Sequence, residues 1–138
     1  MLTRTLLLAL PLALLANVAD LRADDENPIV TFVKSKVKNS DEPFSMTVTF
    51  KVRPGGEKAF EQAFVSCLTN TRKESGCLAY YLNRSVDDPS SFVMFERFKR
   101  IAALESHAKM PHVGELLKTI GPLLDGAPTV SVYGVAGE

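Results

Sequence analysis

Apolar residues recur along this chain with two different periods, and these periods predict its secondary structure. Between residues 46 and 52 apolar and polar side chains alternate, which is typical of a half-buried strand. Over residues 57–73 the apolar side chains recur every three or four positions, which predicts an amphipathic helix. Similar patterns predict the remaining elements, namely strands over 77–84, 92–98 and 128–133 and helices over 101–108 and 113–120.

The order of these elements is strand, helix, strand, strand, helix, strand. This is the split β-α-β plan of a ferredoxin-like α+β fold, with an antiparallel sheet that carries its helices on one face. The other face of such a sheet must also be covered. Because the strands are rich in Phe and Tyr, we expect a second copy of the chain to cover it, in a homodimer whose two sheets pack into a barrel.

The first 23 residues have the layout of a secretory signal peptide. Arg4 precedes an uncharged apolar run over residues 6–16, and small residues follow at Ala19 and Ala23, where a peptidase could cut. The run is shorter than the roughly twenty residues that a membrane span requires. We therefore predict an exported protein, periplasmic or secreted, with no stable membrane span; the alternative is an amphipathic or buried N-terminal helix.

Residues 24–45 form a predicted extension before the main domain at 46–138. Asn27 followed by Pro28 is a helix-start signal, because Asn caps well and Pro costs nothing at the first helical position. The apolar spacing that follows predicts a short helix over 28–38, although its β-branched residues leave a strand as the alternative.

Composition excludes several classes of protein. The 138 residues are 46% hydrophobic, which favours one globular domain over disorder. Sixteen basic residues balance sixteen acidic ones, so a nucleic-acid partner is not expected. The two cysteines, Cys67 and Cys77, either pair or remain two buried thiols, and we favour the thiols. Motifs for metal, dinucleotide or nucleotide binding are absent from the sequence, so no metal or other cofactor is predicted.

Several segments of the chain resemble the antibiotic biosynthesis monooxygenase family. The most specific is Glu74-Ser75-Gly76-Cys77-Leu78 together with Leu104-Glu105-Ser106-His107 and Pro111-His112. The likeness extends over about residues 46–135 and includes three further segments, Val52-Arg53-Pro54-Gly55, Asp87-Asp88-Pro89 and Phe92–Phe98.

This resemblance implies a dimeric α+β barrel and a small enzyme that oxidises quinol-like or polyphenolic molecules with O₂, without flavin or metal. A deprotonated electron-rich aromatic can itself pass an electron to O₂, so the protein needs only a binding site, a base and exclusion of water. Two other functions fit the same fold: an isomerase of a small oxygenated metabolite, and an aromatic-binding protein without turnover. Haem cleavage, known in one branch of the superfamily, is disfavoured because the chain has no Trp.

The chain has only two histidines, and both are candidates for the site. His is the side chain whose unperturbed pKa lies nearest neutrality. His107 lies on the flank of a predicted helix, at a position that the resemblance associates with the active-site pocket. It is the candidate catalytic residue, for substrate orientation or proton transfer, and His112 is a candidate substrate-binding residue. The alternative for each is a solvated or capping imidazole.

Four strand residues are further candidates for substrate binding. Glu96 stands in an otherwise apolar strand, where an ionised carboxylate needs a partner, and Arg84 or Arg97 could form a buried ion pair with it. Tyr81 and Asn83 share one face of a strand and could hydrogen-bond a hydroxylated ring. Phe98 lies on the same strand face as Glu96. Packing in the core is the favoured interpretation for the phenylalanines, although a pocket for a planar aromatic would use the same residue type.

Overall fold

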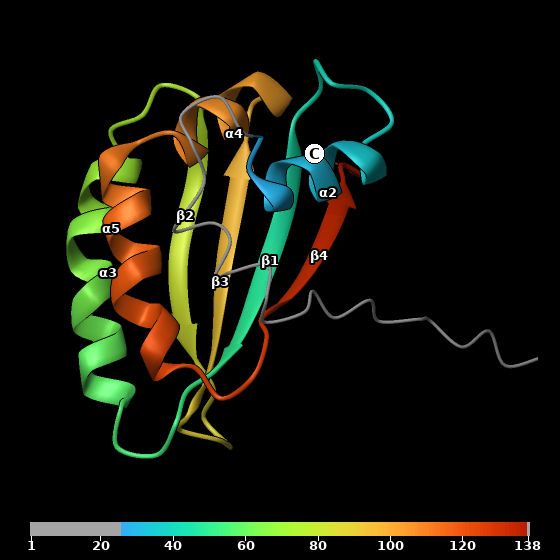
Figure 1. The fold of residues 1–138 in the computed structure, drawn as a ribbon. Helices are drawn as coiled ribbons and strands as arrows, with labels where there is room; N and C mark the ends of the chain where they lie inside the picture. Colours follow the sequence, from blue (N-terminus) through green and yellow to red (C-terminus); the bar gives the residue numbers. More distant parts are fainter. Residues whose placement is uncertain (1–25, 138) are drawn as a thin grey trace, which may run out of the picture.

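The computed structural model describes residues 26–137. The predicted signal peptide over residues 1–23 therefore lies outside the described residues. Figure 1 shows one antiparallel sheet with helices packed in front of it. The elements, in chain order, are α2 (Pro28–Lys36), β1 (Phe44–Lys51), α3 (Glu57–Thr71), β2 (Cys77–Arg84), β3 (Ser91–Phe98), α4 (Ile101–Ala108), α5 (Pro111–Ile120), a 3₁₀ turn η1 (Gly121–Leu123) and β4 (Thr129–Gly134).

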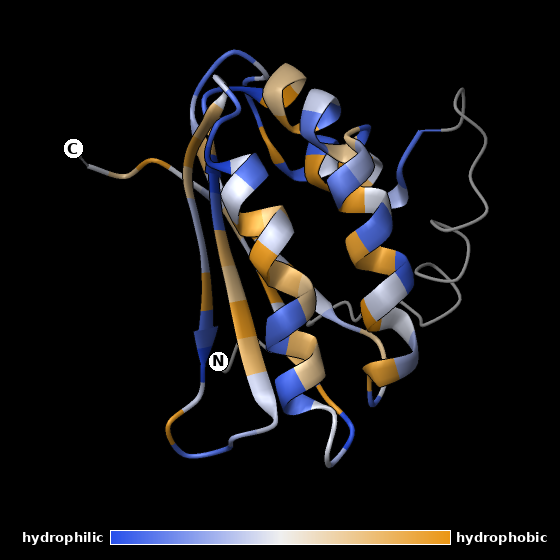
Figure 2. Ribbon diagram, turned by 90° about the vertical axis from the view of Figure 1, so that its left-hand side faces the viewer, coloured by the Kyte–Doolittle hydropathy of each residue, from blue (hydrophilic) through white to orange (hydrophobic). Residues whose placement is uncertain are grey.

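The four strands lie in the order β2-β3-β1-β4, and every neighbouring pair is antiparallel. This is the ferredoxin-like arrangement, so the predicted fold class is confirmed. Helix α3 connects β1 to β2, and α4 and α5 connect β3 to β4. In the side view of Figure 2 the strands lie to the left of the helices, which confirms that the helices occupy one face.

The predicted elements are present, and their ends differ by a few residues. The segment predicted as helix or strand over 28–38 is helical, because the Asn27 side chain accepts a hydrogen bond from the backbone N–H of Ile29 at 2.9 Å and Val37 is extended. β1 begins at Phe44, two residues before the predicted start, because Phe44 is already buried and paired with Phe98.

The core lies between the sheet and the helices. Phe50, Phe60, Phe64 and Phe92 form its aromatic part, with ring centroids 4.7–6.0 Å apart along the contacts. Burial of each such side chain contributes about 1.5–3 kcal/mol to stability. Cys67 and Cys77 are both free thiols, as the sequence analysis favoured, but only Cys67 is buried and Cys77 is half-buried.

The opposite face of the sheet carries no helix among the described residues. Tyr81, Phe95, Thr47 and Ser131 form one row across it, each paired with the next on the neighbouring strand. Tyr81 is 54% exposed. In the part of the chain that the structure covers, no helix is both long enough and apolar enough to cross a bilayer.

Candidate active site

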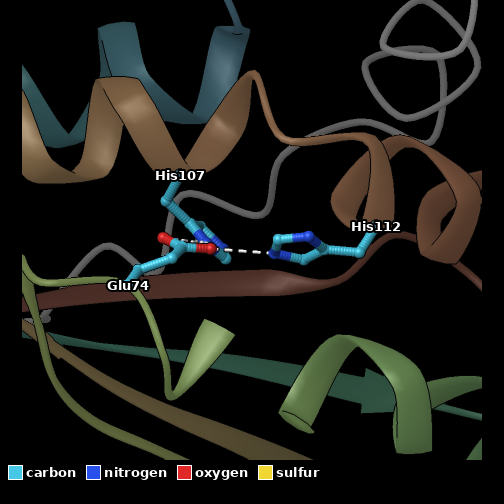
Figure 3. Close-up of side chains that lie close together, drawn as sticks. All are labelled: Glu74, His107 and His112. Atoms are coloured by element: carbon cyan, nitrogen blue, oxygen red, sulfur yellow. Dashed lines mark hydrogen bonds and ion pairs between the residues drawn. The ribbon is translucent and has the colours of Figure 1, made fainter. Parts of the chain in front are cut away.

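Three polar side chains from separate parts of the chain meet at one end of the helix layer. Glu74 comes from the connection between α3 and β2, His107 from the last turn of α4, and His112 from the first turn of α5. Nδ1 of His107 lies 3.1 Å from both carboxylate oxygens of Glu74, and Nε2 of His112 lies 2.8 Å from Oε1 of Glu74. Figure 3 shows the Glu74 carboxylate against the His107 ring, with the His112 ring pointing toward the pair.

Local sequence explains why these residues meet. Gly76 allows the α3–β2 connection to touch α4, because a Cβ at this position would lie 2.4 Å from the Cβ of Ala103. The backbone carbonyl of Gly76 also accepts a hydrogen bond from Lys99, just before α4. Pro111 begins α5 soon after α4 ends, since proline is well suited to the first helical position. The short connection between these two helices therefore brings His112 near His107.

His107 is buried, and its surroundings favour the neutral ring. Burial lowers its pKa, and the hydrogen bond and charge of Glu74 oppose this shift without cancelling it. A neutral ring that donates its Nδ1–H to a carboxylate keeps a lone pair on Nε2. Edge and tilted contacts with Tyr80 and Phe98, at centroid distances of 5.4 and 5.2 Å, hold the ring in place. This arrangement can accept a proton at Nε2.

His107 also lines a cavity of about 70 Å³ between the sheet and the helices. The lining is mainly apolar, with Met46, Val48 and Met94 from the sheet and Leu104, Leu116 and Ile120 from the helices among its members. The side chains with polar groups that line it are those of Asn27, Tyr80, Glu96 and His107. Binding sites for drug-sized ligands start at roughly 300 Å³, so this cavity suits a much smaller molecule.

Glu96 lies on the cavity wall as an isolated carboxyl group. Its side chain is almost fully buried, at 7% exposure for the residue, and within residues 26–137 it makes no hydrogen bond or ion pair. Burial, and to a smaller extent the charge of Glu74, raises the pKa of Glu96 to about 8. The carboxyl group is therefore protonated at neutral pH and can donate a hydrogen bond.

The ion pair considered for Glu96 is absent from the described part of the chain. Arg84 instead binds Glu61 and the carbonyl oxygen of Pro89. Arg97 follows Glu96 directly in β3, so strand alternation points its side chain to the opposite face of the sheet. That part of the sequence analysis was wrong, because the carboxyl group reaches the cavity as a neutral acid and needs no cation.

The other predicted substrate-binding residues do not line the cavity. Tyr81 and Asn83 lie on the outer face of the sheet, and the Asn83 side chain hydrogen-bonds the carbonyl oxygens of Tyr81 and Val93. Phe98 is fully buried behind His107, and His112 binds Glu74. The structure thus brings His107 and Glu96 to the cavity.

Sequence analysis did not nominate Tyr80 or Glu74. Tyr80 pairs directly with Glu96 across β2 and β3, so the alternation that places Glu96 inward also places Tyr80 inward. Its hydroxyl oxygen lies 3.5 Å from Sγ of Cys67. Glu74 belongs to a segment on which the family resemblance rests, but the residues around it do not predict that it contacts two histidines.

Within residues 26–137, the same three side chains form the group that could hold a metal ion. One oxygen of Glu74 and one nitrogen each of His107 and His112 lie within 4.8 Å of one another. Two imidazoles and a carboxylate suit zinc or iron. In the arrangement observed, one nitrogen of each ring hydrogen-bonds the Glu74 carboxylate.

Comparison with known proteins identifies the family. The family model described as antibiotic biosynthesis monooxygenase matches residues 43–119. The chain belongs to this family. A curated relative in Mycobacterium tuberculosis, named "Putative monooxygenase Rv0793", is 32% identical over 70% of this chain and 94% of its own length.

Solved structures of family members have the same fold. The structure of Rv0793 from M. tuberculosis matches with a TM-score of 0.66 and 31% identity, over 70% of this chain and 98% of that chain. A structure described as a putative antibiotic biosynthesis monooxygenase from Nitrosomonas europaea matches with a TM-score of 0.67. At 20% identity, over 72% of this chain and 96% of that one, this second likeness shows the fold alone.

Proposed function

We propose that this protein is a monooxygenase that oxidises small, uncharged quinols or phenols with O₂, without flavin or metal. Membership of the antibiotic biosynthesis monooxygenase family supports a monooxygenase-type activity. The observation that carries the proposal is the buried His107 ring, hydrogen-bonded to Glu74 at the wall of a mainly apolar cavity. That combination offers a base beside a mainly apolar ligand site.

In the proposed reaction, Nε2 of His107 removes the proton of a substrate hydroxyl group. The resulting phenolate is electron-rich and passes an electron to O₂, and the two radicals combine to form a carbon–oxygen bond. One oxygen atom stays on the ring and the other leaves as water, whose two hydrogens are the proton held by His107 and the proton lost from the ring carbon that bonded to oxygen. The quinol, oxidised to a hydroxyquinone, supplies all the electrons, so no external reductant is required.

Glu96 favours an uncharged substrate. The protonated carboxyl group can donate a hydrogen bond to a substrate oxygen. No Lys or Arg among the described residues lines the cavity, and the Glu74 carboxylate lies directly behind His107. An anionic ligand would therefore lose its hydration without gaining a cation, which is costly in an apolar site.

We also propose that the protein is an exported homodimer in which the outer sheet faces meet. The exposed Tyr81 and half-buried Phe95 are apolar groups on a face that the described chain leaves open. Sedimentation of the full chain should give a dimer, and Tyr81→Glu should weaken it. A monomer at micromolar concentration would contradict this part of the proposal.

Oxygen uptake with a panel of quinols and phenols tests the activity. We expect O₂ consumption with at least one single-ring quinol and its loss in His107→Ala. Ser35→Ala is the matched control, because Ser35 is exposed on α2 and contacts only the backbone of its own helix. Proton exchange in the substrate without O₂ uptake would favour an isomerase, and ligand binding without either reaction would favour a binding protein.

A further inference from the structure

Part of the cavity wall comes from outside the segment that the family model matches. α2 ends at Lys36, before residue 43, where the family match begins. The match to the Rv0793 structure uses 70% of this chain but extends over 98% of that chain, so this chain has residues that the Rv0793 structure does not match. Asn27, Ile29 and Val30 nevertheless line the same cavity as His107.

α2 is firmly attached to the domain. Val30 and Val33 are buried against the core, at 2% and 0% exposure. Nζ of Lys34 lies 3.0 Å from a carboxylate oxygen of Glu105 on α4, the helix that carries His107. In Figure 1, α2 lies over β1 and β4 on the same face as the other helices. The helix is therefore a fixed wall of the cavity.

We propose that α2 determines which ligands this protein accepts, by limiting the cavity to molecules with a single aromatic ring. Ile29 and Val30 line a space of about 70 Å³, so their side chains take up room that a second fused ring would require. α2 selects ligands by size, whereas Glu96, on the sheet across the cavity from α2, selects them by charge. This inference rests on the proposed function only in taking the cavity as the ligand site.

Ligand binding to the full chain tests whether α2 limits ligand size, and this test does not depend on turnover. Phenol and 2-naphthol serve as one-ring and two-ring probes, with affinities measured by calorimetry. In Ile29→Ala and in the double variant Ile29→Ala/Val30→Ala, we expect the affinity ratio of 2-naphthol to phenol to rise roughly 10-fold, as for other small changes in apolar pockets. Ile29→Trp should instead abolish binding of phenol, because the indole fills the cavity.

Ser35→Ala, on the exposed side of the same helix, should leave the ratio unchanged. A melting curve for each variant shows whether it is folded, and Ile29→Ala removes only a partly buried side chain, so it should fold even if the double variant does not. An unchanged ratio in folded Ile29→Ala would overturn the inference, as would absence of binding by the wild type. If the affinity ratio changes as expected but no O₂ is taken up, the proposed reaction is wrong, and the inference that α2 limits ligand size still holds.

Discussion

Nδ1 of His107 lies 3.1 Å from each oxygen of the Glu74 carboxylate, so this carboxylate determines which ring nitrogen carries the proton. Because the carboxylate can only accept, Nδ1 must donate, and Nε2 keeps its lone pair. His112 contacts the same carboxylate at 2.8 Å. Glu74 therefore acts as a positioning residue, and its effect on the reaction should appear through His107.

Replacement of Glu74 by Gln should impair His107 in two measurable ways. The amide no longer fixes the Nδ1–H form, so we expect kcat to fall on the order of 100-fold, within the usual contribution of a general base. The hydrogen bond and charge of Glu74 raise the pKa of His107, so their loss should lower that pKa further. The acidic limb of the kcat–pH profile should then move to lower pH, as should the midpoint of the His107 NMR titration.

Glu115→Gln is the control for this experiment, because it makes the same chemical change on the exposed surface of α5. It should alter neither kcat nor the titration of His107. An unchanged kcat in Glu74→Gln, with the protein folded, would show that the carboxylate has only a structural role.

How much of this site could be predicted from sequence depends on the range of the contacts involved. Hydrophobic period alone located the strands, the helices and the inward face of Glu96. Pairing of Glu74 with His107 spans 33 residues of sequence and depends on the close approach at Gly76, which no local pattern encodes. Tyr81 is a candidate in the sequence because it shares a strand face with Asn83, but alternation alone does not show which face is inward. The pairing of Tyr80 with Glu96 across β2 and β3 places Tyr80 on the inner face.

Glu96 should make the stability of the protein depend on pH. Its pKa is about 8 in the folded protein and 4.5 as the ordinary value. Below pH 4.5 both folded and unfolded chains hold the proton. Between these two values only the folded chain retains it, so the free energy of unfolding should fall by up to about 1.4 kcal/mol per pH unit as pH rises. Above about pH 8 the contribution should level off.

Glu96→Gln removes this titration while it keeps the size of the side chain. Urea unfolding at a series of pH values should therefore show the variant gaining stability over the wild type between about pH 5 and pH 8. Glu115→Gln should follow the wild-type curve. Parallel curves for wild type and Glu96→Gln would mean that the carboxyl group is ionised in the folded protein and that its proposed role as a hydrogen-bond donor is wrong.

Chelation distinguishes the hydrogen-bonded arrangement of Glu74, His107 and His112 from a metal centre. If the two imidazoles act only as donors to the carboxylate, O₂ uptake should survive dialysis against EDTA, and added Zn²⁺ should not increase it. Activity that is lost on chelation and restored by one divalent metal would instead assign these residues as ligands.

Gly76 should be intolerant of any side chain, because the α3–β2 connection reaches α4 at this point. A Cβ there would lie 2.4 Å from the Cβ of Ala103, so Gly76→Ala must push the two segments apart. We expect a loss of about 1–3 kcal/mol in the free energy of unfolding, as for other overpacked contacts, together with reduced turnover because Glu74 moves away from His107. Gly114→Ala is the matched control, since a Cβ at Gly114 in α5 has no neighbour within 4 Å, and it should be neutral or stabilising. The double variant Gly76→Ala/Ala103→Gly removes the colliding atom and should recover much of the lost turnover. If Gly76→Ala matched the wild type in both urea unfolding and turnover, the close approach would not be what holds Glu74 against His107.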